Sequence, residues 1–236
     1  MQAIILAAGV GSRMRPLTLE KPKCLIDIAG KSFIDRQIRV FKNCSIDKIT
    51  VVTGYKSDLI KEHLKNTVSY AYNPFYETTN SIVSLWLATL NIDDDILIVN
   101  SDVIFDEELI QKMINCDKDI NIATSKLWSE ERGYKAQIVN DMVVDMSMNI
   151  AKDKIGGEYA GLIFIKKEVM NNLKLQSEKL LMEKQFNVWF EDMVVQMIKS
   201  GNIANAIYVN NEKWYEIDSV PELEYAREKF GEQIKI

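Results

Sequence analysis

The residues best suited to chemistry lie within the first 25 positions of the chain. Gly9 and Gly11 follow a short apolar run, and glycines there can turn several backbone N–H groups toward one phosphate. Arg13 adds a planar guanidinium that matches phosphate oxygens. Lys23 follows a proline at the start of the next apolar run. The spacing therefore predicts a site for phosphate groups.

Two common phosphate-binding motifs do not fit this segment. The dinucleotide fingerprint needs a third glycine where Met14 stands, and the P-loop needs a Gly-Lys-Ser/Thr sequence that the segment does not contain. A pair of glycines after a strand is also common in ordinary turns. The usual NAD loop and the usual ATPase loop are thereby excluded.

Two aspartates are candidates for binding a divalent cation. Asp102 directly follows an apolar run, and Asp218 precedes a predicted helix. Carboxylate oxygens beside phosphates are ligands that Mg²⁺ favours. Aspartates are also frequent in turns and as helix N-caps, so the residues by themselves leave both interpretations open.

Alternating strands and helices must position these residues in the first half of the chain. Strands are predicted at residues 2–7, 48–53, 68–72, 95–100 and 120–124. Helices are predicted at residues 32–44, 56–65, 82–90 and 106–115. Such alternation predicts an α/β fold with a parallel sheet, whose ligands lie at the carboxyl ends of the strands. The glycine loop, Gly54, Asn73 and Asp102 would all lie at that edge.

The second half of the chain has a different pattern. We expect a hairpin at 133–146, a strand at 158–165, one long helical stretch at 177–200, short strands at 203–209 and 214–217, and a helix at 221–230. No linker or repeat separates the two halves. A single domain over residues 1–236 is therefore expected, with this half acting as a lid on the same sheet.

Composition limits the class of protein. The chain has 236 residues, 47% of them hydrophobic and 27% charged, which suits one globular α/β domain. A net charge of −5 without a basic block argues against nucleic acid as a partner. Three scattered cysteines form no disulfide or metal pattern, and no apolar run approaches a membrane span. We expect a cytoplasmic protein without a membrane partner.

The motifs together closely resemble those of the sugar-phosphate nucleotidyltransferase superfamily. LAAGVGSRMRPLT followed by EKPKCLIDIAGK matches the signature of that superfamily in order and spacing. WYEIDSVPELEYA is similar to a late segment of bacterial phosphocholine cytidylyltransferases, and GEYAG with an upstream lysine resembles cytidylyltransferases that act on phosphonates. The resemblance implies a Rossmann-like fold with a mostly parallel central sheet, flanking helices and a small hairpin-and-helix lid. Ser101-Asp102 departs from the Gly-Asp that is common at this position in the superfamily.

The resemblance also implies roles for particular residues on the nucleotide side. Arg13 and Lys23 would stabilise charge at the reacting phosphates, and Asp102 and Asp218 would bind Mg²⁺. Thr79 and Asn80 stand where a helix begins, so either could cap that helix or contact the nucleobase. The full set implied to contact the nucleotide is Leu6, Ala8, Gly9, Gly11, Ser12, Arg13, Lys23, Gly54, Asn73, Thr79, Asn80 and Ser84.

On the acceptor side the resemblance points to Lys135 and Glu158. Lys135 would bind the acceptor's phosphoryl group, whereas Glu158 would face a cationic amine or organise the metal side. Alternatively, Lys135 could be an ordinary solvated lysine and Glu158 a glutamate at the end of a strand. Residues 1–125 would then form a nucleotide-binding half and residues 126–236 an acceptor-binding half.

The function that the resemblance implies is a Mg²⁺-dependent transfer of CMP from CTP to a small phosphorylated or phosphonate acceptor. Phosphocholine, 2-aminoethylphosphonate and a phosphorylated amino acid such as glutamine phosphate are all open as acceptors. The product would serve to decorate a surface glycan or lipid. Two alternatives remain: a sugar-1-phosphate uridylyl- or thymidylyltransferase, and a nucleotide-binding regulatory protein without turnover. A homodimer is also left open.

Overall fold

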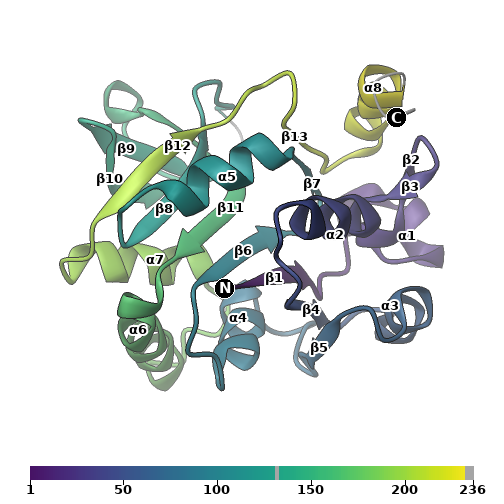
Figure 1. Ribbon diagram of the computed structural model, residues 1–236, viewed down its shortest axis with the longest axis horizontal. Helices are drawn as coiled ribbons and strands as arrows, with labels where there is room; N and C mark the ends of the chain where they lie inside the picture. The colour runs from purple at the N-terminus through teal and green to yellow at the C-terminus, as the bar shows by residue number, and fades with distance from the viewer. Residues whose placement is uncertain (131–132, 232–236) are drawn as a thin grey trace.

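A nine-stranded mixed sheet runs through the middle of the molecule, with helices on both of its faces (Figure 1). The computed structural model describes residues 1–130 and 133–231. The strand order is β5-β4-β1-β6-β11-β8-β12-β10-β9, and β11 also pairs with β9. The α/β fold expected from the sequence is confirmed.

Four strands form the parallel part of the sheet. They are β5 (Ser69–Tyr72), β4 (Ile49–Thr53), β1 (Gln2–Ala7) and β6 (Ile96–Asn100). Their crossovers run through the helices α2 (Phe33–Asn43), α3 (Ser57–Leu64) and α4 (Ser81–Thr89), and α5 (Glu107–Asn115) follows β6. The register pairs Ile4 with both Thr50 and Ile98, which places the carboxyl ends of β1, β4 and β6 at one edge.

The rest of the sheet is mixed. β11 (Gly157–Ile165) lies antiparallel between β6 and β8 (Ile120–Ser125), and β8 is parallel to β12 (Ala204–Tyr208). The hairpin of β9 (Lys135–Val139) and β10 (Met142–Ser147) closes this side. Because β11 runs antiparallel to β6, its first residues lie beside the carboxyl end of β6, where Asp102 follows.

Two hydrophobic clusters hold the helices to the sheet. Successive residues of a strand point to opposite faces, so Ile4 and Ile5 of β1 belong to different clusters. One cluster joins the sheet to α4, α6 (Met170–Met182) and α7 (Phe190–Lys199). The other joins it to α2, α3 and α5. Each fully buried aliphatic side chain contributes roughly 1.5–3 kcal/mol, so these two layers supply most of the stability.

The single helical stretch expected at 177–200 is wrong, because the structure has two helices there. α6 ends at Met182, Lys184 adopts a left-handed backbone angle (φ 61°), and α7 begins at Phe190. The turn is tied to the start of α4, since Asn80 N donates to Phe186 O and Phe190 N donates to Ser81 Oγ. The helical spacing of apolar residues continues across the break because both helices pack on the same cluster.

A third, smaller cluster joins the start of the chain to its end. It contains Met14 near the glycine loop, Ile28 of the hairpin β2–β3 (Asp27–Ile28, Lys31–Ser32), Ile217, and Leu223 of α8 (Val220–Gly231). Here β13 (Tyr215–Glu216) pairs antiparallel with β7 (Val103–Ile104), next to Asp102. This pairing brings the segment that carries Asp218 to the carboxyl end of β6.

The remaining elements are short helical turns: η1 (Ser12–Met14), α1 (Leu17–Glu20), η2 (Lys23–Leu25), η3 (Lys152–Lys154) and η4 (Lys167–Val169). Over residues 1–130 and 133–231, no helix has the length and apolar character needed to cross a bilayer.

Candidate active site

The glycine loop that follows β1 is shaped by close packing at Gly11. This residue has φ +63°, and a Cβ there would lie 3.1 Å from Thr18 Cγ2 and 3.2 Å from Lys23 Cβ. The backbone angle therefore favours glycine, and the tight space adds to that preference. Thr18 Oγ1 donates to Gly11 O at 2.9 Å and holds the loop against the next turn. No atom would lie within 4 Å of a Cβ at Gly9, so packing does not explain that glycine.

Lys23 is buried, and it lies between the two aspartates that the sequence suggests for a cation. Its Nζ donates to Asp102 Oδ2 at 2.6 Å and to Asp218 Oδ1 at 2.8 Å, while Arg13 Nη2 contacts Asp218 Oδ1 at 2.8 Å. Only 9% of Lys23 is exposed. Burial by itself would lower the pKa of Lys23, but the charges and hydrogen bonds of the two aspartates raise it overall. The ammonium is thus held charged between two carboxylates.

The two aspartates satisfy the geometric condition for sharing one cation. Two oxygens that contact the same nitrogen must lie close together, although their residues are far apart in the chain. Asp102 Oδ1 is also buried and has no hydrogen-bond partner in the described part of the chain. Hard carboxylate oxygens of this kind fit Mg²⁺, which usually completes its shell with phosphate oxygens and water. Accordingly, no group of three or more His, Cys, Asp or Glu residues forms a metal cage within 1–130 and 133–231.

On the other side of the loop, Gly54 lets β4 approach β1 closely. A Cβ at Gly54 would lie 2.7 Å from Tyr76 Cβ and 2.8 Å from Ala8 O. Tyr55 N donates to the same Ala8 oxygen at 3.0 Å. Leu6 and Ala8 lie on and just after β1, so the structure brings both beside Gly54 and the loop.

Asn73 joins the polar residues predicted for nucleobase contact. It is buried, and its Nδ2 donates to Ser84 Oγ at 3.0 Å and to Thr79 Oγ1 at 3.4 Å. Its Oδ1 accepts from Phe75 N at 2.9 Å. Asn80 does cap α4, because its side chain accepts from Ser81 N. Asn73, Thr79 and Ser84 thus form one connected network, whereas Asn80 bonds to Ser81 N and Asn187 O instead.

Lys135 and Glu158 stand opposite each other on β9 and β11 and form an ion pair. Lys135 Nζ lies 3.0 Å from Glu158 Oε2 and donates to Gly133 O at 3.1 Å. Ser129 N donates to Glu158 Oε2 at 2.8 Å. The structure therefore brings the predicted pair together, with the carboxylate of Glu158 turned to the Lys135 ammonium.

The site contains carboxylates that the sequence interpretation missed. Burial raises the pKa of the half-buried Glu216 well above its usual range, and the charges of Asp102 and Asp218 raise it further. Glu216 stands two residues before Asp218, and alternate residues of an extended segment share a face, so this spacing could have placed Glu216 on the same side as Asp218. Glu191 is 3% exposed, and burial raises its pKa to about 8. An acidic residue in the first turn of a helix looks ordinary in sequence, so nothing marked Glu191.

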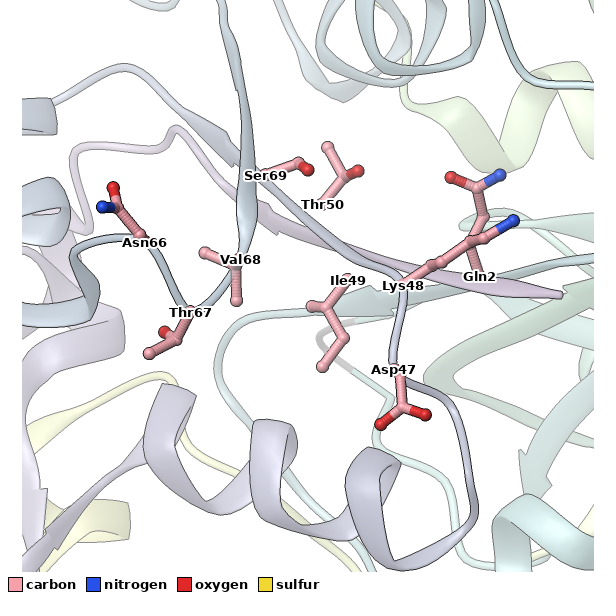
Figure 2. A pocket seen from close by; sticks show the side chains of 9 residues that line it. All are labelled: Gln2, Asp47, Lys48, Ile49, Thr50, Asn66, Thr67, Val68 and Ser69. Carbon is pink, nitrogen blue, oxygen red and sulfur yellow. The ribbon is translucent and has the colours of Figure 1, made fainter.

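A separate pocket of about 350 Å³ lies at the opposite edge of the sheet (Figure 2). Its lining comes from the amino ends of β1, β4 and β5 and from the turns before them: Gln2, Asp47, Lys48, Ile49, Thr50, Asn66, Thr67, Val68 and Ser69. Ligands of parallel sheets bind at the carboxyl ends instead, which is where Lys23 and its partners lie.

Comparisons with known proteins agree with this geometry. CTP:phosphoglutamine cytidylyltransferase of Campylobacter jejuni is 30% identical over 97% of this chain and 100% of that protein. Choline-phosphate cytidylyltransferase of Haemophilus influenzae is 33% identical over 55% of this chain and 56% of that protein. The structure of the CTP:phosphocholine cytidylyltransferase from Streptococcus pneumoniae superposes with a TM-score of 0.78 at 25% identity, covering 96% of this chain and 97% of that one. The MobA-like NTP transferase domain matches residues 3–148. The resemblance seen in the motifs is confirmed: the chain belongs to the MobA-like NTP transferases and is a nucleotidyltransferase.

Proposed function

We propose that this enzyme is a Mg²⁺-dependent cytidylyltransferase that transfers CMP from CTP to a small phosphorylated or phosphonate acceptor. The observation that carries the proposal is the Lys23 ammonium, held between Asp102 and Asp218 beside the glycine loop. The relatives named above support the choice of CTP, because their names describe cytidylyl transfer to phosphoglutamine and to phosphocholine.

The reaction is an in-line displacement at the α-phosphorus of the nucleotide. An oxygen of the acceptor's phosphoryl or phosphonyl group forms the new P–O bond. The bond from the α-phosphorus to the bridging oxygen breaks, and its electron pair leaves with pyrophosphate. The attacking oxygen is already ionised near neutral pH, so the site needs no strong general base. Rate enhancement then comes from positioning and from stabilisation of charge.

The residues around Lys23 supply that stabilisation. The glycine loop and Arg13, whose side chain is largely exposed, bind the departing phosphates. Mg²⁺ held by Asp102 and Asp218 neutralises charge on the phosphate oxygens when it is bound. Asp102 and Asp218 would hold the ion, and the Lys23 ammonium would then be free to contact the phosphates around the reacting centre.

The two halves of the carboxyl edge of the sheet bind different substrates. Leu6, Ala8, Gly54 and the Asn73 network bind the nucleoside, within the half formed by residues 1–125. Lys135 binds the acceptor's phosphoryl group in the half formed by residues 126–236, and Glu158 holds Lys135 in place through their ion pair. The CMP-linked product serves as an activated head group for a surface glycan or lipid, made in the cytoplasm.

A substrate matrix tests this proposal directly. The four NTPs are each incubated with amine-bearing phosphates, phosphonates and sugar 1-phosphates, with and without Mg²⁺, and pyrophosphate is measured. We expect release with CTP, Mg²⁺ and an amine-bearing phosphate or phosphonate. Preference for UTP or dTTP with a sugar 1-phosphate would replace this proposal by the sugar-nucleotide alternative. Nucleotide binding without release in any combination would identify a regulatory protein.

A further inference from the structure

Two buried oxygen atoms beside the reacting centre are left without partners. Glu191 Oε2 and the Tyr159 hydroxyl have no hydrogen-bond partner in the described residues, and the two residues are 3% and 5% exposed. Buried polar groups are paired in the great majority of cases, because an unpaired one costs free energy. A ligand that supplies hydrogen-bond donors would remove this cost.

The antiparallel register that pairs Leu162 of β11 with Val99 of β6 directs the start of β11, which carries Tyr159, toward the segment after β6 that carries Asp102. Burial raises the pKa of Tyr159, and the negative charges of three carboxylates raise it further. Those carboxylates belong to Asp102, Glu191 and Glu216. Asp102 likewise contributes to the raised pKa of Glu191. The unpaired groups therefore lie within electrostatic reach of the aspartate that follows β6.

The start of α7 holds Glu191 firmly at this position. Phe190 N donates to Ser81 Oγ at 2.9 Å, and the Phe190 ring packs edge-on against Tyr159 with 6.2 Å between ring centroids. The next carboxylate, Asp192, accepts from Trp189 N and from the Tyr134 hydroxyl. Two adjacent acidic residues are thus treated differently, since Asp192 Oδ2 accepts two hydrogen bonds and Glu191 Oε2 accepts none in the described residues.

The nearby cations are already engaged. Lys135 contacts Glu158, and Lys23 contacts Asp102 and Asp218. Glu191 forms no ion pair with any residue in 1–130 or 133–231. With its pKa raised to about 8 by burial, Glu191 is largely protonated in the free protein at neutral pH. A bound cation with N–H groups lowers that pKa, so it pairs with the carboxylate and also donates hydrogen bonds to the unpaired oxygens.

We propose that Glu191 and Tyr159 form a subsite for a primary ammonium group of the acceptor, and that this subsite disfavours a quaternary ammonium. The inference rests on the proposed cytidylyl transfer and narrows its acceptor class. A primary ammonium offers three N–H donors to the unpaired oxygens. A trimethylammonium group offers none, so it buries the same oxygens and leaves them unpaired. Glu158, the carboxylate that the sequence suggested for the amine, already has the Lys135 ammonium at 3.0 Å.

The test compares three acceptors that share a phosphate and differ in the amine: 2-aminoethyl phosphate, phosphocholine and ethyl phosphate. Pyrophosphate release with CTP and Mg²⁺ gives KM and kcat for each in the wild-type enzyme and in Glu191→Gln. We expect the wild type to favour 2-aminoethyl phosphate over phosphocholine. Glu191→Gln should raise KM for 2-aminoethyl phosphate by about 30-fold or more, the size expected for removing one partner of a buried charge pair. The KM for CTP and for ethyl phosphate should change little.

Two further variants keep the result interpretable. Glu178→Gln makes the same chemical change at an exposed position of α6 and should leave all three acceptors unaffected. Tyr159→Phe removes only the hydroxyl and should also lower the preference for 2-aminoethyl phosphate over phosphocholine. It therefore tests the subsite even if Glu191→Gln does not fold. Thermal stabilisation by 2-aminoethyl phosphate alone gives a readout without turnover and should weaken in both subsite variants.

The outcomes separate this inference from the proposed function. Pyrophosphate release with equal KM values for 2-aminoethyl phosphate and phosphocholine would overturn the subsite and keep the cytidylyltransferase. Equal losses for 2-aminoethyl phosphate and ethyl phosphate in Glu191→Gln would overturn it as well, and would identify Glu191 as structural. No release with CTP and any acceptor would overturn the function and the subsite together.

Discussion

Replacing Lys23 by alanine should destabilise the free protein, which the sequence alone did not suggest. A loop lysine is expected to contribute little to folding, yet the structure buries Lys23 and places its Nζ within 2.8 Å of two carboxylates. Removing one partner of a buried ion pair costs about 3–5 kcal/mol. The side chains of Asp102 and Asp218 keep 20% and 15% exposure, and Arg13 still contacts Asp218, so we expect the lower end of that range.

Urea unfolding in the absence of divalent cations measures this loss. Lys21→Ala is the matched control, because it removes an exposed lysine two positions earlier and should leave the free energy of unfolding unchanged. Lys23→Met keeps most of the aliphatic stem and isolates the charge from its packing. Added Mg²⁺ should restore stability to the Lys23 variants more than to the wild type, since the ion replaces the ammonium between Asp102 and Asp218.

Two results would refute this reasoning. The first is a Lys23→Met protein with the same unfolding free energy as Lys21→Ala. The second is strict additivity when Lys23→Met is combined with Asp102→Asn, because groups in direct contact should show coupling. Lys23→Ala should also lower kcat by roughly two orders of magnitude, as expected when an electrostatic stabiliser of the transition state is lost. Near wild-type turnover in a folded Lys23→Ala enzyme would remove Lys23 from the proposed chemistry.

The remaining predictions concern the metal, a buried acid and the loop. Asp102→Asn and Asp218→Asn should each weaken the Mg²⁺ dependence of turnover. The double variant should lose little more kcat than either single variant, because both substitutions remove the same ion. Additive losses in kcat would contradict a shared ion. Glu191 has a folded-state pKa of about 8, above the unfolded value of about 4.3, so the free energy of unfolding of the free protein should fall as pH rises from about 4.3 to about 8 and level off above that. Glu191→Gln should flatten that profile in urea unfolding, and an unchanged slope would show that another group titrates. Gly54→Ala would place a Cβ 2.7 Å from a side-chain carbon and should raise KM for CTP, whereas Gly9→Ala has open space and should not displace the loop.

Much of the fold follows from local patterns that the sequence contains. Apolar β-branched runs at Ile49–Thr53 and Ile96–Asn100 predict buried strands, and the amphipathic segment at Phe33–Asn43 predicts a helix. Alternation of the two types predicts a parallel arrangement and places Asp102 at a carboxyl end. The glycine and lysine motifs at the start of the chain predict the phosphate side of the site, and there the structure places Gly11 in a left-handed conformation that favours glycine.

Other features depend on contacts between distant segments. The strand β11 enters the sheet antiparallel between β6 and β8, and no local pattern specifies which neighbours a strand takes. The break between α6 and α7 is hidden in the sequence, because both helices face one cluster and keep one spacing. Whether a charged residue is a solvated surface group or a buried one is likewise decided by what packs over it. The sequence marks Lys23 as a phosphate contact but not as a buried residue, and Glu191 looks ordinary in it. Only the tertiary structure buries Lys23 between Asp102 and Asp218 and leaves Glu191 Oε2 without a partner in the described residues.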